Sequence, residues 1–542
     1  MQFLKLAALV LAINIPVLCA ENDQQRVDRI FAGFDKAGSP GCSLGVIRDG
    51  AFLYRKSYGE GSLELGVPLS SQSVFYMGSV SKQFTAASVV LAAEQGSLSL
   101  DDDVRKYIPE LPDYGHPITL RQMLHHTSGL RDFLGLLGLA GGHGEDLHTR
   151  EELLDLIVHQ KSLNYVPGDE YLYSNTNYFL LGEVIKRATG KTLAAFAAEN
   201  IFQPLGMVHT RFYDDHTLVL PGRVAAYAPG SHGDFAVDWS TNFDTVGAGG
   251  LMSTVDDLLL WDKNFYDNKL GKGTLLKEML TRGVLNNGKQ IDYALGLEIG
   301  KYRGLPTVEH DGALFGYRTE ILRFPEQHFS VVCLCNLSTS RPSGLAHKVA
   351  DIYLEKNLEP LTGASKPATT GAVSDADRFS GRYEDMRDHS IVSFISKDGA
   401  LSGFGSVLQN VGPGRFETPG GAAIAFEDSN GAMNATITYG GQTITQAIRL
   451  QDFHPEATAL AACAGNYASE ELGVTYRVST SNGSLMLRIG WDTPMKLDPI
   501  RQDEWANDDL GTLVFQRDAQ NRISGFALFA GRVRNIAFVK AQ

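Results

Sequence analysis

The stretch from Phe75 to Gly96 constrains the fold of this chain more than any other segment. From Val80 to Glu94 it is apolar on nearly every face, and this pattern predicts a helix that is buried all round rather than laid on a surface. Gly96 is a typical residue for the position just beyond the end of a helix. The rest of the chain must therefore pack around this helix.

Ser79 and Lys82 stand three residues apart at the opening turn, a spacing that places both side chains on one face. A serine hydroxyl is a weak nucleophile that needs a neighbouring base, and the helix N-terminus favours negative charge on its oxygen. Burial of an ammonium is costly, so Lys82 is expected either to pair or to have a lowered pKa. Most Ser-x-x-Lys patterns are surface turns, so the case for chemistry depends on partners further along.

Tyr173 and Asn175 are the first candidate partners. They follow a Pro-Gly turn on a segment expected to be extended, where residues two apart point to one side. Tyr173 would take the Ser79 proton if Lys82 and a second cation keep the phenol partly ionised. Asn175 would orient Lys82 and a substrate amide. The same Tyr-x-Asn spacing at Tyr266 falls in a helical tail, where it is structural.

The His310-Asp311-Gly312 motif precedes an apolar strand and supplies further candidates. A cation at His310 would face Ser79 across the cleft, although a lone histidine is more often structural. Gly312 would let backbone come close to a ligand. The amide of Ala313 would join that of Ser79 in an oxyanion hole. No metal or other cofactor is expected, because metal-site spacing is absent from the clustered histidines, which are His125, His126, His143 and His148.

Taken in order, these motifs resemble those of the serine hydrolases related to penicillin-binding proteins and class C β-lactamases. The resemblance covers roughly residues 25–360 and implies an α+β fold in which an antiparallel sheet flanked by helices meets a helical subdomain, with the active site between them. The matching pieces are Ser79-Val80-Ser81-Lys82, Leu124 to Leu130, Tyr173-Ser174-Asn175, Gly247 to Leu251 and His310-Asp311-Gly312.

The resemblance also implies roles for individual residues. Ser79 would be the acylated nucleophile, Lys82 its activator, and Tyr173 the general base and then the acid. Asn175 would contact the substrate and Lys82, while the amides of Ser79 and Ala313 would form the oxyanion hole.

One departure concerns the third motif, which is His-Asp-Gly where typical β-lactamases and carboxypeptidases have Lys-Thr-Gly. The missing lysine weakens the expected binding of a β-lactam or a C-terminal carboxylate. A His-x-Gly motif resembles that of D-aminopeptidases, which carry two C-terminal β-barrels, and some esterases of the superfamily also lack the lysine. In D-aminopeptidases a loop from the last barrel enters the active site, and Gly490 to Pro494 or Gln502 to Asp509 is the candidate here.

The chain order fits this layout. Expected helices cover 27–36, 119–124, 150–160, 179–189, 253–265 and 346–354, expected strands cover 41–47, 51–58, 319–324 and 329–336, and a glycine-rich loop covers 135–144. Beyond a small, polar, Pro-containing stretch, only short alternating strands remain. The Gly-x-Tyr at 381–383 recurs at 465–467, and the turn at 398–399 recurs at 482–483 with the same spacing, which predicts two related β-barrels.

We therefore expect a signal peptide over 1–20, a β-lactamase-like catalytic domain over 21–361, a linker over 362–376, and β-barrel domains over 377–453 and 454–542. Met1 to Ala20 has a short apolar core and small residues near its end, which is typical of a secretory signal. The protein is expected to be exported to the periplasm or the extracellular space, with no stable membrane span. Its net charge of −14 argues against a nucleic-acid partner.

One cysteine pattern and one serine pattern each allow more than one interpretation. Cys333 and Cys335 would point the same way on one strand, and either would meet Cys42 if the two strands were neighbours, but buried free thiols are an equal alternative. Gly41-Cys42-Ser43-Leu44-Gly45 matches Gly-x-Ser-x-Gly, yet a nucleophile elbow needs a strand before it and a helix after it. Here a helix precedes and a strand follows, so Ser43 is rejected as a nucleophile.

The first functional hypothesis is an exported serine hydrolase that forms an acyl-enzyme on Ser79. Its substrate would be a small peptide or ester, and peptidoglycan-derived D-amino-acid peptides cut in the manner of a D-aminopeptidase are favoured. The alternatives within the superfamily are an esterase and a β-lactamase or D,D-carboxypeptidase. The alternative of another class is a non-catalytic module that binds peptidoglycan or β-lactams.

Overall fold

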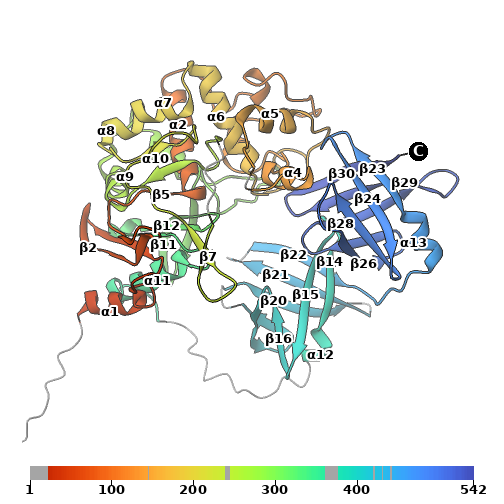
Figure 1. Ribbon diagram of the computed structural model, residues 1–542. Coiled ribbons are helices and arrows are strands. Elements are labelled where there is room, and N and C mark those ends of the chain that lie inside the picture. Colours follow the sequence, from red (N-terminus) through yellow and green to blue (C-terminus); the bar gives the residue numbers. More distant parts are fainter. Residues whose placement is uncertain are drawn as a thin grey trace, which may run out of the picture.

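The structure is a computed structural model that describes residues 22–144, 146–238, 244–360, 376–418, 421–429, 431–439 and 442–541. The expected signal peptide over 1–20 lies outside these residues, as does the expected linker over 362–376 except for Ala376. The described chain forms an α+β body of sheet and helices, with two β units beside it (Figure 1). In this described part, no helix has the length and apolar character needed to span a membrane.

A six-stranded antiparallel sheet joins the two ends of the α+β body, as expected. Its strand order is β10-β11-β12-β13-β1-β2, so the first strand of the chain lies between β2 and the last strand of this body. The strands are β1 (Cys42–Arg48), β2 (Ala51–Tyr58), β10 (Glu298–Tyr302), β11 (Leu305–Leu314), β12 (Tyr317–Phe324) and β13 (Phe329–Cys335).

Helices cover both faces of this sheet. On one face, α1 (Asp23–Phe31) and α11 (Pro342–Tyr353) pack side chains such as Val27, Phe31 and Val349 against the strands. On the other face, α9 (Val255–Asp267) lies against β1 and β13, and the helical subdomain continues from there. Burying both faces explains why β1 and β13 are apolar along almost their whole length rather than alternating.

The predicted central helix is α2 (Ser81–Glu94), and every residue from Ser81 to Ala92 in it is buried. A 3₁₀ turn over Gly78–Val80 precedes it, and Gly96 has the left-handed conformation (φ 80°) that suits glycine after a helix. Its neighbours are α6 (Asn175–Thr189), α7 (Leu193–Ala197) and α10 (Leu275–Met279). The expectation of a helix enclosed on all sides is confirmed.

Two local predictions in the helical subdomain were wrong. The expected glycine-rich loop at 135–144 begins inside a helix, α4 (Phe133–Leu139), because Asp132 caps it by accepting hydrogen bonds from the amides of Leu134 and Gly135. Helix α6 begins at Asn175 rather than at residue 179. The Asp132 carboxylate accepts the Asn175 amide hydrogen bond at 2.6 Å, so a first-turn donor is satisfied from outside the helix.

The remaining elements of the α+β body are short and connect these parts. A three-stranded sheet, β5-β9-β6, leads the chain toward the 3₁₀ turn. The elements are α3 (Leu120–Leu124), α5 (Arg150–Val158), α8 (Gln203–Leu205), β3 (Glu60–Ser62), β4 (Val67–Pro68), β5 (Phe75–Tyr76), β6 (Arg211–Phe212), β7 (Tyr227–Pro229), β8 (Phe235–Val237) and β9 (Leu251–Ser253).

The two C-terminal β units are antiparallel barrels, the first nearly closed and the second closed. The first contains α12 (Ala376–Phe379), β14 (Gly381–Asp385), β15 (Ser390–Lys397), β16 (Ala400–Gly403), β17 (Ser406–Val407), β18 (Gln409–Gly412), β19 (Arg415–Glu417), β20 (Ala423–Ser429), β21 (Ala432–Tyr439) and β22 (Gln442–Arg449). The second contains α13 (Ala457–Cys463), β23 (Gly465–Ser469), β24 (Val474–Ser481), β25 (Ser484–Ile489), β26 (Met495–Arg501), β27 (Glu504–Asn507), β28 (Gly511–Arg517), β29 (Ile523–Ala530) and β30 (Val533–Lys540).

The repeated Gly-x-Tyr has the same position and makes the same hydrogen bond in both barrels. Each opens the first strand after a short helix, and each tyrosine hydroxyl donates to a carbonyl four residues earlier. Tyr383 donates to Phe379 at 2.9 Å and Tyr467 to Cys463 at 2.7 Å. The repeated Asp-Gly and Asn-Gly turns have positive φ at both residues, as tight hairpins require.

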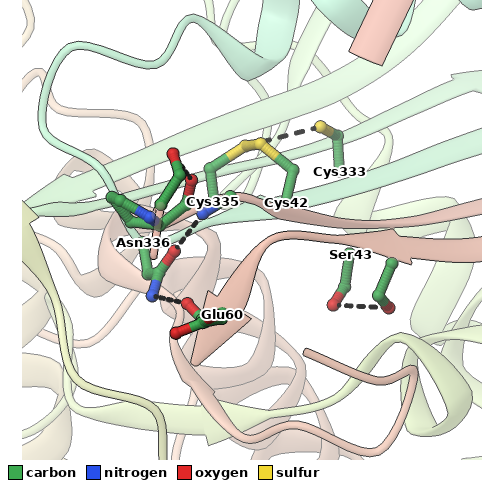
Figure 2. The surroundings of a disulfide bond; sticks show 10 residues. Cys42, Ser43, Glu60, Cys333, Cys335 and Asn336 are labelled. Carbon is green, nitrogen blue, oxygen red and sulfur yellow. Dashed lines mark hydrogen bonds between the residues drawn. A yellow bond between two sulfur atoms is a disulfide. The ribbon is translucent and has the colours of Figure 1, made fainter. Parts of the chain in front are cut away.

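The structure decides between the cysteine alternatives. Cys42 and Cys335 face each other in the register of β1 and β13 and form a disulfide (Figure 2). Cys333 is a buried free thiol whose sulfur lies 3.8 Å from that of Cys335. Ser43 is fully buried in β1, where its hydroxyl donates to the carbonyl of Ser70. The rejection of Ser43 as a nucleophile agrees with this position.

Candidate active site

Ser79 and Lys82 lie where the 3₁₀ turn meets α2, and their side chains are in contact. Lys82 Nζ lies 3.1 Å from Ser79 Oγ. It also lies 2.9 Å from Asn175 Oδ1 and 2.7 Å from the carbonyl oxygen of Ala248, and both of these atoms can only accept a hydrogen bond. The lysine is fully buried, whereas Ser79 is half-buried and lines a cavity.

The pKa of the Lys82 amine is lowered to about 7, chiefly because burial disfavours its charged form. The Asp132 carboxylate opposes this shift and raises the pKa, whereas Arg532 lowers it further. Near neutral pH a large share of the amine is therefore uncharged. Of the two outcomes expected for Lys82, pairing or a lowered pKa, the structure shows the lowered pKa.

Asn175 is held by Asp132, a residue that sequence reasoning missed. One oxygen of the buried Asp132 carboxylate accepts hydrogen bonds from both the backbone amide and the side-chain Nδ2 of Asn175, at 2.6 and 2.8 Å. This fixes which end of the side-chain amide points to Lys82, namely the oxygen. The available sequence signal was position, because Asp132 stands two residues after the Leu124 to Leu130 block.

Tyr173 lies over Lys82, with the amine 4.8 Å from the centre of its ring. Burial raises the pKa of the Tyr173 phenol well above its ordinary value, and this effect outweighs the lowering by Ser79 and Arg532. Among the described residues, the phenol oxygen has no direct hydrogen-bond partner. The partly ionised phenol on which its role as a base depended is therefore not favoured, and the phenol carries its proton.

His126 positions the Tyr173 segment. The two rings pack with centroids 4.2 Å apart, and the His126 Nδ1 accepts a hydrogen bond from the Ser174 amide at 3.1 Å. Burial lowers the pKa of His126 well below its ordinary value, so the ring is neutral and can accept at this nitrogen. His126 therefore holds the segment that carries Tyr173 in position.

His310 lies beside Tyr173 and Tyr293, but it is not the expected cation. Its Nδ1 donates to the carbonyl of Asp311 at 2.7 Å, so its Nε2 accepts from the Tyr293 hydroxyl at 3.0 Å. Burial lowers the pKa of His310 to about 4, because the charged ring would lose its solvation. The ring lies 6.3 Å from that of Tyr173, centroid to centroid. At neutral pH, His310 is a neutral wall of the site.

Gly312 and Gly78 allow two segments of the chain to lie side by side. A Cβ atom on Gly312 would stand 2.1 Å from the Met77 carbonyl oxygen, and one on Gly78 would stand 2.6 Å from the Ala313 amide nitrogen. The close approach expected at Gly312 is therefore to the protein itself rather than to a ligand. Its consequence is that the Ala313 backbone lies beside Gly78 and Ser79.

Ser79 and Ala313 also share a small cavity of about 50 Å³. The residues around it come from β5, α4, α6, the segment before β9 and the end of β11. Most of the side chains are apolar, and they are Tyr76, Phe133, Leu134, Phe179, Val246, Ala248 and Leu314. The cavity therefore offers a nonpolar space next to the hydroxyl.

Comparison with known proteins identifies the family. Residues 27–354 match the family described as beta-lactamase. The chain belongs to the beta-lactamase family. It is 31% identical over 332 residues to penicillin-binding protein 4* of Bacillus subtilis, covering 58% of this chain and 72% of that protein. It is 24% identical over 539 residues to a D-aminopeptidase of Brucella anthropi, covering 93% and 96% of the two chains.

A solved structure shares the fold of this beta-lactamase family member over both the α+β body and the C-terminal region. It is the octameric penicillin-binding protein homologue from Pyrococcus abyssi, with a TM-score of 0.56 and 21% identity over 86% of this chain and 98% of that one. The expected relation to penicillin-binding proteins and D-aminopeptidases is confirmed. This protein is a hydrolase of the beta-lactamase fold.

The second barrel of this family member reaches the site through the hairpin between β29 and β30. Arg532, at its tip, has its guanidinium carbon 4.8 Å from the centre of the Tyr173 ring. This hairpin is neither of the segments suggested by the resemblance. In the Gly490 to Pro494 segment, Asp492 faces His143, and in the Gln502 to Asp509 segment, Glu504 contacts His389 of the first barrel. The sequence offered no signal for the β29–β30 hairpin, because its two-residue turn matches no known motif.

One group of potential metal ligands in this family member lies between the barrels. The His389 Nδ1 is 2.7 Å from carboxylate oxygens of both Glu384 and Glu504. The guanidinium of Arg501 pairs with both carboxylates as well. The Arg501 guanidinium thus already balances the charge that a metal ion would balance. We therefore interpret this cluster as a contact between the two barrels.

Proposed function

We propose that this protein is an exported serine hydrolase that forms an acyl-enzyme on Ser79 and cleaves amide bonds in small D-amino-acid peptides. The observation that carries the proposal is the environment of the Lys82 amine. A neutral amine has two N–H groups and one lone pair. Asn175 Oδ1 and the Ala248 carbonyl can only accept, so they take both N–H groups. The lone pair is then left for the hydroxyl proton of Ser79, 3.1 Å away.

In the proposed acylation, Lys82 accepts this proton as Ser79 Oγ forms a bond to the carbonyl carbon of the substrate. The amides of Ser79 and Ala313 donate to the oxygen that becomes negative. The carbon–nitrogen bond then breaks, and the leaving amine takes the proton of Tyr173, which regains one from Lys82. Water hydrolyses the ester in the second half of the cycle. The raised pKa of Tyr173 suits this role as a proton donor.

The proposed substrate class has two supports. A relative that aligns with almost the whole chain is called a D-aminopeptidase. The cavity beside Ser79 is about 50 Å³, so it fits a small apolar side chain such as that of alanine better than a bulky one. Because His310 is neutral, it does not attract a carboxylate. Binding of the β-lactam carboxylate at this motif is therefore expected to be weak.

Export is proposed from two further observations. The apolar pattern of residues 1–20 is that of a secretory signal. The disulfide between Cys42 and Cys335 is of a kind that persists mainly in oxidising compartments. The proposed location is the periplasm or the extracellular space.

The proposed function is tested by a panel of chromogenic substrates with the purified protein. We expect turnover of D-alanine p-nitroanilide, at least tenfold slower turnover of the L-isomer, and little hydrolysis of a chromogenic cephalosporin. A short-chain p-nitrophenyl ester would separate esterase from amidase activity. A fluorophosphonate probe should label Ser79. A protein that binds such compounds without labelling or turnover would be a binding module instead.

Activity is expected to rise with pH through about 7, because the proposed base is the neutral form of Lys82. Below that pH the amine is protonated and cannot accept the Ser79 proton. The measurement is kcat/KM between pH 5 and 9 on a short-chain p-nitrophenyl ester, which has no titrating group in this range. His310, with a pKa lowered to about 4, cannot account for such a limb.

Glu298 provides the control for this profile. Loss of solvation and then the neighbouring carboxylates, among them Asp311 and Glu309, raise the pKa of its carboxyl to about 7 as well, although the residue as a whole is exposed. No role in the proposed chemistry is assigned to it. The Glu298→Gln variant should keep the limb near pH 7. A limb that disappears in this variant, or a rate that falls as pH rises through 7, would contradict the assignment to Lys82.

A further inference from the structure

Among the described residues, the buried arginines Arg131, Arg323 and Arg534 each pair with a carboxylate, whereas Arg532 does not. In the described parts of the chain, no carboxylate pairs with its guanidinium, and its side chain is exposed. Arg534, two residues on, pairs with Glu170 and Asp388. Arg131 nearby pairs with Glu471. The hairpin therefore uses its other arginine to hold the structure together and presents Arg532 with its charge unmatched.

The backbone of Arg532 is firmly placed. Its carbonyl oxygen accepts hydrogen bonds from the Asp132 amide at 3.3 Å and from the Asn164 side chain at 2.9 Å. Asp132 is the residue that also orients Asn175. The hairpin tip is thus tied to the same residue that fixes the site, and the guanidinium lies over the face of Tyr173.

We propose that Arg532 is a specificity-determining residue whose guanidinium binds a carboxylate on the leaving side of the substrate. The inference rests on the proposed function and narrows its substrates to short peptides in which the residue that departs carries a free carboxylate. Guanidinium groups bind carboxylates through two parallel hydrogen bonds, and an exposed arginine with no ion-pair partner among the described residues is suited to this.

The leaving side is assigned from the position of Tyr173. In the proposed chemistry this phenol gives its proton to the departing amine, and Arg532 stacks on the same ring. The small apolar cavity extends from Ser79 toward Phe133 and Val246, which suits the acyl side. A Lys-Thr-Gly motif carries a positive charge on its lysine. His310 stands at that position here and is neutral, so it does not replace this charge. Arg532 brings a positive charge from the second barrel to the face of Tyr173 instead.

The competing explanation is that Arg532 acts only on the protein, by lowering the pKa of Lys82 and Tyr173. That role would affect all substrates alike and would move the pH limb of every one of them. Carboxylate binding would instead act through KM and only on substrates that carry the carboxylate. The two explanations therefore separate in a comparison of matched substrates.

The test compares hydrolysis of D-alanyl-D-alanine with that of its C-terminal amide by the wild type, Arg532→Ala and Arg532→Lys. We expect the wild type to prefer the acid. Arg532→Ala should lower kcat/KM for the acid by about 10- to 100-fold, mainly through KM, and for the amide by less than about threefold. Arg532→Lys should restore part of the loss. Arg522→Ala is the control, because Arg522 lies on another hairpin of the same barrel and pairs with Asp518.

A binding measurement keeps this inference separate from the proposed function. Calorimetry with the Ser79→Ala protein should show at least tenfold tighter binding of the acid than of the amide. If the wild type hydrolyses neither compound while this difference holds, the hydrolase proposal fails and the carboxylate site stands. Equal binding of both compounds, binding of neither, or an equal loss of activity on both in Arg532→Ala overturns the inference.

Discussion

Replacement of Ser79 by alanine is expected to lower kcat/KM by at least about 10³-fold on any substrate that the wild type hydrolyses. The variant keeps the cavity, the amides and Lys82, but it has no atom that can form the acyl-enzyme. Ser79 is only half-buried, and its hydroxyl contacts the Lys82 amine and the Tyr173 phenol, so the loss of stability should be small. Steady-state kinetics, together with loss of fluorophosphonate labelling, measure the effect.

Ser88 gives a matched control for this change. It lies in the same helix, is fully buried, and donates to the Phe84 carbonyl at 2.8 Å. Ser88→Ala removes one hydroxyl from α2 without touching the site, so activity should stay within about threefold of the wild type. If Ser79→Ala retained full turnover on the preferred substrate, another nucleophile would be responsible and the mechanism above would be wrong.

Replacement of Glu471 by alanine is expected to destabilise the protein by about 3–5 kcal/mol, because it leaves the Arg131 guanidinium buried without its counter-ion. The two side chains are 0% and 5% exposed, and their charged atoms lie 2.6 Å apart. Arg131 belongs to the catalytic body and Glu471 to the second barrel, so the pair joins the two. The thermal midpoint should fall by about 3–4 °C, because the entropy of unfolding grows with chain length and is about 1.1 kcal/mol/K for 542 residues; calorimetry or circular dichroism measures the shift.

The neighbouring Glu470 provides the control, because its pair with Lys161 is exposed on the surface. Exposed ion pairs contribute little, so Glu470→Ala should leave the thermal midpoint almost unchanged. Equal midpoints for the two variants would contradict the view that the buried pair holds the barrel in place.

This pair also links the barrels to the chemistry. Arg131 additionally donates to the carbonyls of Arg534 and Asn535, next to the hairpin that carries Arg532. Figure 1 shows the second barrel against α4 and α5, and Leu136 and Leu139 of α4 share its apolar core. Loosening of this contact should therefore move Arg532 away from Tyr173. The barrel is in this sense part of the active-site wall.

Much of the fold was predictable because its signals are local. An apolar stretch without a polar face predicted α2, and alternating or continuous apolar runs predicted β1, β2, β12 and β13. The repeated Gly-x-Tyr predicted two related β units, since the tyrosine makes the same contact in each. The errors came where a distant side chain decides a local conformation. Asp132 caps α4 and satisfies the first turn of α6, and both helices begin where that carboxylate allows.

The candidate site divides in the same way. Ser79 and Lys82 were predictable as a pair because one helical turn sets their distance, and Tyr173 and Asn175 stand in a recognisable motif. Their charge states were not predictable, because a pKa depends on burial by residues from the whole chain. His310 illustrates this point, since its motif suggested a cation and its surroundings make it neutral.

The sequence by itself determined the family, the order of the domains and the hydroxyl–amine pair, because these reside in short stretches whose spacing is fixed by helix and strand geometry. Only the tertiary structure decided that Asp132 holds Asn175, that Tyr293 holds His310, that Cys42 bonds to Cys335 rather than to Cys333, and that Arg532 covers Tyr173. Each of these contacts joins residues far apart in the chain. Their distances follow from how sheet, helices and barrel pack, which no local pattern records.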